Sequence, residues 1–124
     1  MVNKKKILVV DDEDDMLVLL EKRLTWACYE VIKASGGYEA VQKAKIWKPD
    51  LILLDIMLPD IDGGEVLELL KEDPDTKNIP VVFLTALFTK DDKKEKGNML
   101  GGNVYLSKTF ETEELLNVVK NNIR

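Results

Sequence analysis

The sequence contains no histidine and only one cysteine, Cys28. Without histidine, the chain can form neither a histidine-assisted nucleophilic triad nor a metal site with imidazole ligands. A single cysteine excludes a disulfide bond within the chain and is typical of proteins from a reducing compartment. The chemistry of any functional site must therefore come from carboxylates, lysine, hydroxyl groups and backbone oxygens.

Long hydrophobic runs and excess positive charge are also absent. No apolar stretch approaches the roughly 20 residues of a membrane-spanning helix, and no signal peptide is visible. The 124 residues include 18 basic and 23 acidic side chains, which gives a net charge of −5. Because an acidic domain repels phosphate groups, we expect neither nucleic acid nor a membrane as a direct partner. We expect a cytoplasmic location.

The hydrophobic pattern predicts one α/β domain. Five apolar runs alternate with five segments of helical periodicity, which indicates a doubly wound parallel sheet. Among doubly wound sheets we expect the flavodoxin-like strand order 2-1-3-4-5, in which the first and third strands are neighbours. We expect the helix over 89–100 to be the least stable, and Trp26, Tyr29 and Trp47 to pack between helices and sheet. The expected strands are 5–10, 29–34, 51–54, 79–84 and 104–106, and the expected helices are 14–27, 38–47, 66–73, 89–100 and 111–123.

A short apolar run, Leu51 to Leu54, leads directly into Asp55. An apolar run without alternation is typical of a strand buried on both faces of a parallel sheet. Pro59 and the turn pair Asp62–Gly63 follow, so Asp55 is expected at the carboxyl end of the strand. Ligands bind at this edge of open α/β sheets, and a carboxylate there costs free energy unless a charge balances it.

Three other strands are also followed by polar residues. Asp11 and Asp12 follow the first strand, Thr85 the fourth and Lys108 the fifth. The predicted strand order brings Asp11, Asp12 and Asp55 together, and a hard divalent cation such as Mg²⁺ would relieve their repulsion. Asp55 could then form an aspartyl phosphate, with the cation and Lys108 neutralising the phosphoryl oxygens. Taken alone, each residue has an ordinary structural explanation, such as a solvated helix start, a turn cap or a surface lysine.

Four motifs carry these residues: ILVVDDE (7–13), DLILLDIMLPDIDG (50–63), VVFLTA (81–86) and YLSK (105–108). Together they resemble the receiver domain of two-component response regulators, the family that includes the chemotaxis protein CheY. The similarity extends over nearly the whole chain, so we expect residues 1–124 to be a single receiver domain.

The resemblance implies a phosphoryl-transfer site. Asp55 would be the phosphoacceptor and would share Mg²⁺ (or Mn²⁺) with the acids of the first motif. Asp12 would bind the ion directly, Asp11 mainly through water, and the backbone carbonyl of Met57 would be a further ligand. The donor would be the phosphohistidine of a sensor histidine kinase or of a histidine phosphotransfer protein.

The same resemblance implies a switch. Thr85 would hydrogen-bond the phosphoryl group, Lys108 would pair with it, and Tyr105 would turn inward on activation. The change would reach an output face formed by helix 89–100, the fifth strand and the last helix. There it would act on an unknown output partner or effector domain. We expect no enzyme activity beyond Mg²⁺-dependent self-phosphorylation and slow autodephosphorylation, and a homodimer through the last two helices is possible.

The chain departs from the family pattern after Lys108. The family usually has proline there, across a cis bond, whereas this chain has Thr109. A cis bond to a non-proline residue costs roughly 2.5–4 kcal/mol, so either the fold bears that cost or the bond is trans and Lys108 is redirected. The departure motivates an alternative function, a receiver-like interaction module that works without phosphorylation.

Met57 and Leu87 are both apolar and are expected near the path of the water that would attack the phosphoryl group. They therefore predict slow loss of that group.

Overall fold

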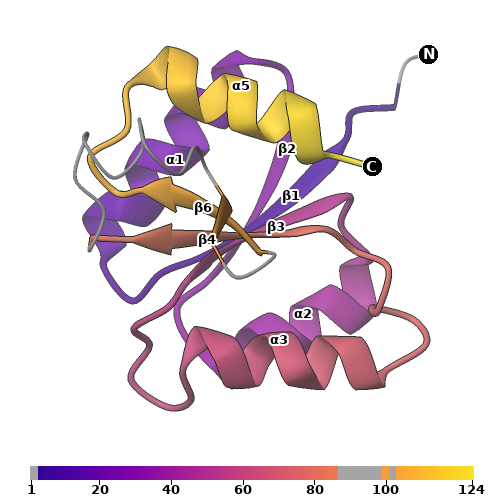
Figure 1. Ribbon diagram of the computed structural model, residues 1–124. Coiled ribbons are helices and arrows are strands. Elements are labelled where there is room, and N and C mark those ends of the chain that lie inside the picture. The colour runs from indigo at the N-terminus through magenta and orange to yellow at the C-terminus, as the bar shows by residue number, and fades with distance from the viewer. Residues whose placement is uncertain (1–2, 87–98, 101–102) are drawn as a thin grey trace.

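A computed structural model describes residues 3–86, the backbone of 99–100, and residues 103–124. They form a six-stranded sheet of order β2-β1-β3-β4-β6-β5, covered by helices on both faces (Figure 1). Five strands are parallel, and the order predicted from the sequence is confirmed, with β6 as the fifth parallel strand. The strands are β1 (Lys6–Val10), β2 (Glu30–Ala34), β3 (Leu51–Asp55), β4 (Val81–Thr85), β5 (Met99–Leu100) and β6 (Asn103–Ser107).

Four helices are present in the described part of the chain. Helices α1 (Asp14–Trp26) and α5 (Thr112–Asn122) cover one face of the sheet, and α2 (Gly37–Trp47) and α3 (Gly63–Glu72) cover the other (Figure 1). Each pair closes its own hydrophobic core over the sheet. None of these described helices has the length and apolar character needed to cross a membrane.

Strand β1 shows how the sequence pattern supplies both cores. Ile7 and Val9 enter the core under α1 and α5, whereas Leu8 and Val10 enter the core under α2 and α3. All four side chains are fully buried. Because successive side chains of a strand point to opposite faces, a strand covered on both sides needs an unbroken apolar run.

The helix expected over 89–100 falls largely outside the described residues. Its last two residues, Met99–Leu100, are described, and they form β5, which pairs antiparallel with β6. The prediction that a helix extends to Leu100 is therefore wrong. Backbone pairing with the exposed edge of β6 satisfies hydrogen bonds that would otherwise be open, and the helical periodicity of this segment was weak.

The packing predicted for the large aromatic residues is only partly confirmed. Tyr29 packs against the core under α1 and α5. Trp26 is 77% exposed and Trp47 is 48% exposed, so the prediction is wrong for both. Each tryptophan is the last residue of its helix, and the buried contacts of these helices end earlier, at Leu24 and Ala44.

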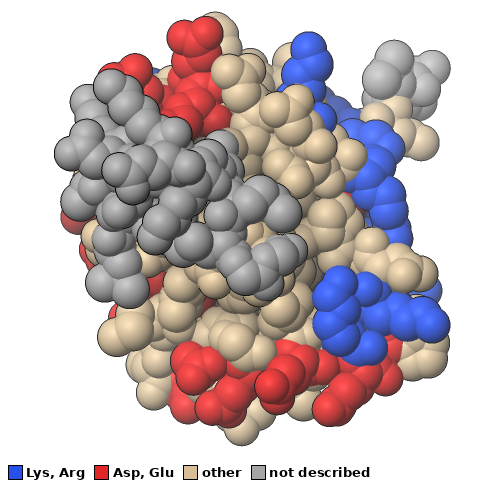
Figure 2. All heavy atoms as spheres, viewed as in Figure 1, with Lys and Arg blue, Asp and Glu red and all other residues tan. Residues whose placement is uncertain are grey.

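Acidic side chains gather on the face over α3 (Figure 2), where Glu65, Glu68 and Glu72 are exposed. Such a face repels polyanions. The carboxyl ends of β1, β3, β4 and β6 meet at one edge of the sheet, because these strands are parallel neighbours. That edge carries the polar residues identified in the sequence.

Candidate functional site

Three carboxylates meet at the carboxyl ends of β1 and β3. Asp11, Asp12 and Asp55 each offer one oxygen, and these oxygens all lie within 4.8 Å of one another. Asp55 ends β3, and Asp11 follows Val10, whose partner in β3 is Leu54. Asp11 is fully buried and Asp55 is 2% exposed, whereas Asp12 is exposed. The structure therefore brings together the three acids for which the sequence predicted a shared site.

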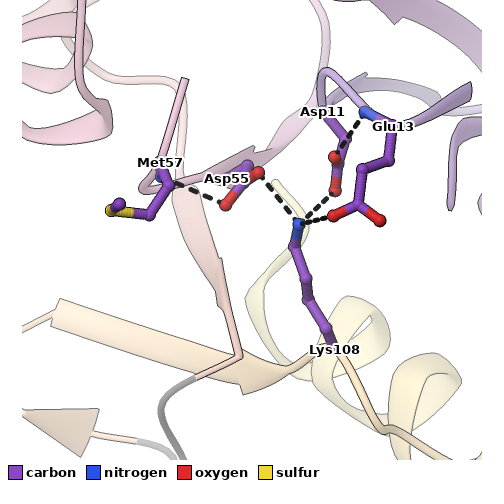
Figure 3. A network of polar contacts seen from close by, with 5 residues as sticks. All are labelled: Asp11, Glu13, Asp55, Met57 and Lys108. Carbon is purple, nitrogen blue, oxygen red and sulfur yellow. Dashed lines mark hydrogen bonds and ion pairs between the residues drawn. The ribbon is translucent and has the colours of Figure 1, made fainter. Parts of the chain in front are cut away.

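Lys108 reaches this cluster from the end of β6. Its Nζ atom lies 2.9 Å from Asp55 Oδ2, 2.9 Å from Asp11 Oδ2 and 3.1 Å from Glu13 Oε1 (Figure 3). Burial opposes the charge on Lys108, but the contacts with Asp55, Asp11 and Glu13 outweigh burial and raise the lysine pKa above its ordinary value. Lys108 is therefore a fixed positive charge in the site at any physiological pH.

The Lys108–Thr109 bond is trans, since the described residues contain no cis peptide bond. The trans bond agrees with the second alternative that we derived from the missing proline, but Lys108 still points at Asp55, so the redirection of Lys108 expected with it is wrong. The turn is held by other groups. The Ser107 and Thr109 hydroxyl oxygens lie 2.8 Å apart, and the backbone N–H of Lys108 donates to the Thr85 carbonyl at 2.9 Å. The N–H of Phe110 donates to the Ser107 carbonyl.

Asp11 is a buried carboxylate with an oxygen available to a cation. Burial raises its pKa, and this outweighs the hydrogen bond that the Glu13 N–H donates to Oδ1 at 2.9 Å and the attraction of Lys108. Apart from its ion pair with Lys108, the buried Oδ2 atom has no hydrogen-bond partner among the described residues. An under-coordinated buried carboxylate oxygen beside two further carboxylates fits a hard divalent cation.

Asp55 uses both of its oxygens. Oδ2 accepts from Lys108, and Oδ1 accepts from the backbone N–H of Met57 at 3.2 Å (Figure 3). The Met57 side chain is 75% exposed. The loop after Met57 closes tightly, because the N–H of Gly63 donates to the Ile56 carbonyl at 2.8 Å. A Cβ atom at Gly63 would lie 2.8 Å from the Asp55 carbonyl oxygen, so any other residue at the start of α3 would force the backbone to shift.

Thr85 and Tyr105 lie on neighbouring strands beside the cluster. Thr85 ends β4, is 3% exposed and pairs in register with Ser107. The Tyr105 ring stacks on Phe83, with centroids 5.3 Å apart, and is partly buried against the core under α2 and α3. In the register of β4 and β6, Tyr105 lies opposite Phe83 and Thr85 lies opposite Ser107.

No role was predicted for Glu13 from the sequence, although the structure places its carboxylate on Lys108. The residue was visible only as one member of the acidic run 11–15. A usable signal was present, because glutamate is not among the residues preferred at a helix N-cap, and Glu13 is the N-cap of α1.

A doubly wound parallel sheet with acids after β1 and β3 and a lysine after the last parallel strand defines a CheY-like α/β switch fold. Residues 7–120 match the family model of the response regulator receiver domain, and the chain belongs to that family. The resemblance noted from the sequence is thereby confirmed. Receiver domains interact with histidine kinases and bind Mg²⁺ in the active site, and the cluster described here offers oxygen ligands of that kind.

Curated relatives are longer than this chain. It is 45% identical over 113 residues to the alkaline phosphatase synthesis transcriptional regulatory protein PhoP of Bacillus subtilis, covering 90% of this chain and 45% of PhoP. It is 43% identical over 106 residues to the response regulator PleD of Caulobacter vibrioides, covering 86% of this chain and 23% of PleD. The chain thus spans about half or less of these two relatives.

Solved structures agree with this assignment. The chemotaxis protein CheY4 of Vibrio cholerae superposes with a TM-score of 0.82 at 30% identity, covering 96% of this chain and 98% of that one. The receiver domain of a sensor histidine kinase from Pseudomonas aeruginosa, with a magnesium ion coordinated in its active site cleft, also has a TM-score of 0.82. Its identity is 28%, and the match covers 96% of this chain and 97% of that one.

Proposed function

We propose that the protein is a phosphorylation switch in which Asp55 receives a phosphoryl group. The donor is the phosphohistidine of a sensor histidine kinase or of a histidine phosphotransfer protein. The observation that carries the proposal is the 2.9 Å contact between the buried Asp55 carboxylate and Lys108, beside the carboxylates of Asp11 and Asp12. This arrangement joins a nucleophile, a fixed cation and a set of oxygen ligands in one place.

In the transfer step, an Asp55 oxygen forms a bond to phosphorus while the bond between phosphorus and the donor nitrogen breaks. The imidazole nitrogen keeps the electron pair. Lys108 stabilises the charge that spreads over the phosphoryl oxygens, and the Thr85 hydroxyl donates a hydrogen bond to one of them. Water returns Asp55 to its original state slowly, and we propose no other enzyme activity.

The residues that would hold Mg²⁺ (or Mn²⁺) are Asp11, Asp12, Asp55 and the backbone carbonyl of Met57. When bound, the ion neutralises negative charge shared by the carboxylates and the transferred group. Replacing Asp12 with alanine should weaken Mg²⁺ binding at least about tenfold, as measured by calorimetric titration. Asp14→Ala removes a neighbouring exposed acid and should leave the affinity nearly unchanged. Equal effects of both variants would contradict the assignment of Asp12.

We propose that the output runs through β4 and β6. The carbonyl of Thr85 accepts a hydrogen bond from the Lys108 N–H, and Thr85 pairs with Ser107 two residues after Tyr105. A shift of Thr85 towards a phosphoryl group is therefore passed to β6, where Tyr105 and the surface of α5 present it to an output partner or effector domain.

The single cysteine agrees with a cytoplasmic location.

The test is direct phosphorylation. Acetyl phosphate or phosphoramidate with Mg²⁺ should add one phosphate to the wild-type protein, as measured by intact-protein mass spectrometry. Asp55→Asn should remain unmodified. Asp62→Asn, which changes an exposed acid at the N-cap of α3, should be modified like the wild type. A wild-type protein that stays unmodified with these donors and with a cognate kinase would exclude the switch.

The phosphorylation-independent alternative loses the observation that motivated it. It rested on the absence of proline after Lys108. The bond from Lys108 to Thr109 is trans, and the Lys108 side chain contacts Asp55 all the same. Nothing else in the described part of the chain favours that alternative.

A further inference from the structure

Glu13 departs from the local rules for a helix start. It is the N-cap of α1, and its carbonyl accepts from the N–H groups of Met16 and Leu17. N-cap side chains normally accept a hydrogen bond from the first turn, but the Glu13 side chain makes no capping bond. It reaches instead to Lys108, 95 positions along the chain (Figure 3). The helix therefore lacks a cap that a shorter polar residue would supply.

The three carboxylates around Lys108 differ in their access to water. The Asp11 side chain is fully buried and that of Asp55 is 3% exposed, whereas the Glu13 side chain is 65% exposed. An ammonium group has three N–H donors, and three carboxylate oxygens already lie within 3.1 Å of this one. Before transfer, while Asp55 is still a carboxylate, Lys108 can bond an oxygen of the incoming phosphoryl group only if one of these three oxygens gives way.

The difference in exposure decides which contact is lost. A buried carboxylate that loses its cation is left without solvation, which is costly. An exposed carboxylate is hydrated as soon as it is released, and an exposed ion pair contributes little stability. Glu13 is therefore the contact that Lys108 can give up most easily.

We infer that Glu13 is the exchangeable partner of Lys108, a positioning residue whose place the phosphoryl group takes. Glu13 holds the ammonium over Asp55 while Asp55 is unmodified, and it competes with the incoming group for the same donor. The inference rests on the proposed function and deepens it, because Glu13 then restrains the rate at which the switch is turned on.

The experiment compares three variants with the wild type. Glu13→Ala removes the charge and the contact. Glu13→Asp keeps the charge but is one methylene shorter, so its reach to Lys108 is lost. Asp14→Ala removes an exposed acid of the same run that makes no contact with Lys108 in the structure. Initial rates of phosphorylation by phosphoramidate at saturating Mg²⁺, and the dissociation constant for beryllofluoride, are measured for all four proteins.

Both Glu13 variants should be phosphorylated about two- to fivefold faster and should bind beryllofluoride tighter by a similar factor, the value expected for an exposed ion pair. Asp14→Ala should match the wild type. If Glu13→Asp behaves like the wild type, or if Asp14→Ala is accelerated as much as Glu13→Ala, the inference is overturned and only general charge repulsion acts. If the wild type is phosphorylated and no variant differs from it, the inference alone falls. If the wild type takes no phosphate and binds no beryllofluoride, both the inference and the proposed function fall.

Discussion

The Nζ atom of Lys108 lies 2.9 Å from Oδ2 of Asp55, although the two residues are 53 positions apart. Asp55 ends β3 and Lys108 follows β6, and β4 lies between these two strands. This contact places a permanent positive charge over the proposed phosphoacceptor. The hydroxyl groups of Ser107 and Thr109 hold the turn that delivers the lysine. A proline after the lysine is therefore not needed to aim it at Asp55.

Replacing Lys108 with alanine should destabilise the protein in the absence of divalent cations. Asp11 and Asp55 would remain buried without their cation, and breaking a buried ion pair costs about 3–5 kcal/mol. Added Mg²⁺ should recover part of the lost free energy of unfolding, as measured by urea denaturation with and without the metal. Lys33→Ala breaks an exposed pair with Glu21 and should cost less than about 1 kcal/mol. Equal losses for the two variants would show that Lys108 is not the charge that balances the acids.

Asp60 should give the protein a pH-dependent stability at acid pH. Its carboxylate accepts from the N–H groups of Tyr38 (3.0 Å) and Gly37 (2.8 Å) at the start of α2, and these bonds lower its pKa to about 2. A lowered pKa means that the stabilisation is complete above the ordinary value of 3.8 and is lost as the pH falls towards 2.

At neutral pH, Asp60→Ala should therefore cost about 1 kcal/mol, the usual value of a helix cap. The difference from the wild type should shrink as the pH is lowered from about 4 to about 2, as followed by denaturation at a series of pH values. Asp75→Ala, which removes another exposed acid that makes no hydrogen bond or ion pair with α2 in the described part of the chain, is measured beside it as the control. A difference that is constant with pH would mean that the Asp60 charge does not act through α2.

Gly63→Ala should destabilise the loop between β3 and α3. A Cβ atom there would lie 2.8 Å from the Asp55 carbonyl oxygen and 2.9 Å from the Ile56 Cα. Because both neighbours are backbone atoms, the chain must shift, at a cost of about 1–3 kcal/mol. Gly64→Ala is a matched control, since its closest neighbour is a side-chain oxygen of Asp62 at 3.2 Å. Thermal unfolding should rank Gly63→Ala clearly below Gly64→Ala, and the reverse order would refute the close approach.

Loss of the phosphoryl group should be slow, because the residue two positions after Asp55 is Met57, whose apolar side chain cannot orient an attacking water as a polar one could. Leu87, the second apolar residue on which this prediction rests, lies outside the described residues. A Met57→Asn, Leu87→Glu double variant should release phosphate faster than the wild type, as followed by the decay of the phosphorylated species. A wild-type half-life equal to or shorter than that of the variant would contradict this expectation.

Much of the fold could be predicted because the main signals are local. Apolar runs such as Leu51 to Leu54 mark strands covered on both faces. Parallel strands necessarily gather their carboxyl ends at one edge, so the convergence of Asp11, Asp12 and Asp55 follows from strand order alone. The pairing of Met99–Leu100 with β6 was missed, because it depends on an open strand edge that no local pattern reveals.

The local order of residues was thus sufficient for the five parallel strands and for the identity of the three clustered acids, and the order of those strands came from the known topology of doubly wound sheets. Which groups meet Lys108, and how deeply each is buried, depends on side chains that come from three separate strand ends. Three features depend on how the helices and strands pack together. They are the trans bond at Thr109, the contact of Lys108 with Glu13, and the exposure of Trp26 and Trp47. Burial and hydrogen-bond partners are properties of the packed elements, and a residue's neighbours in the sequence do not specify them.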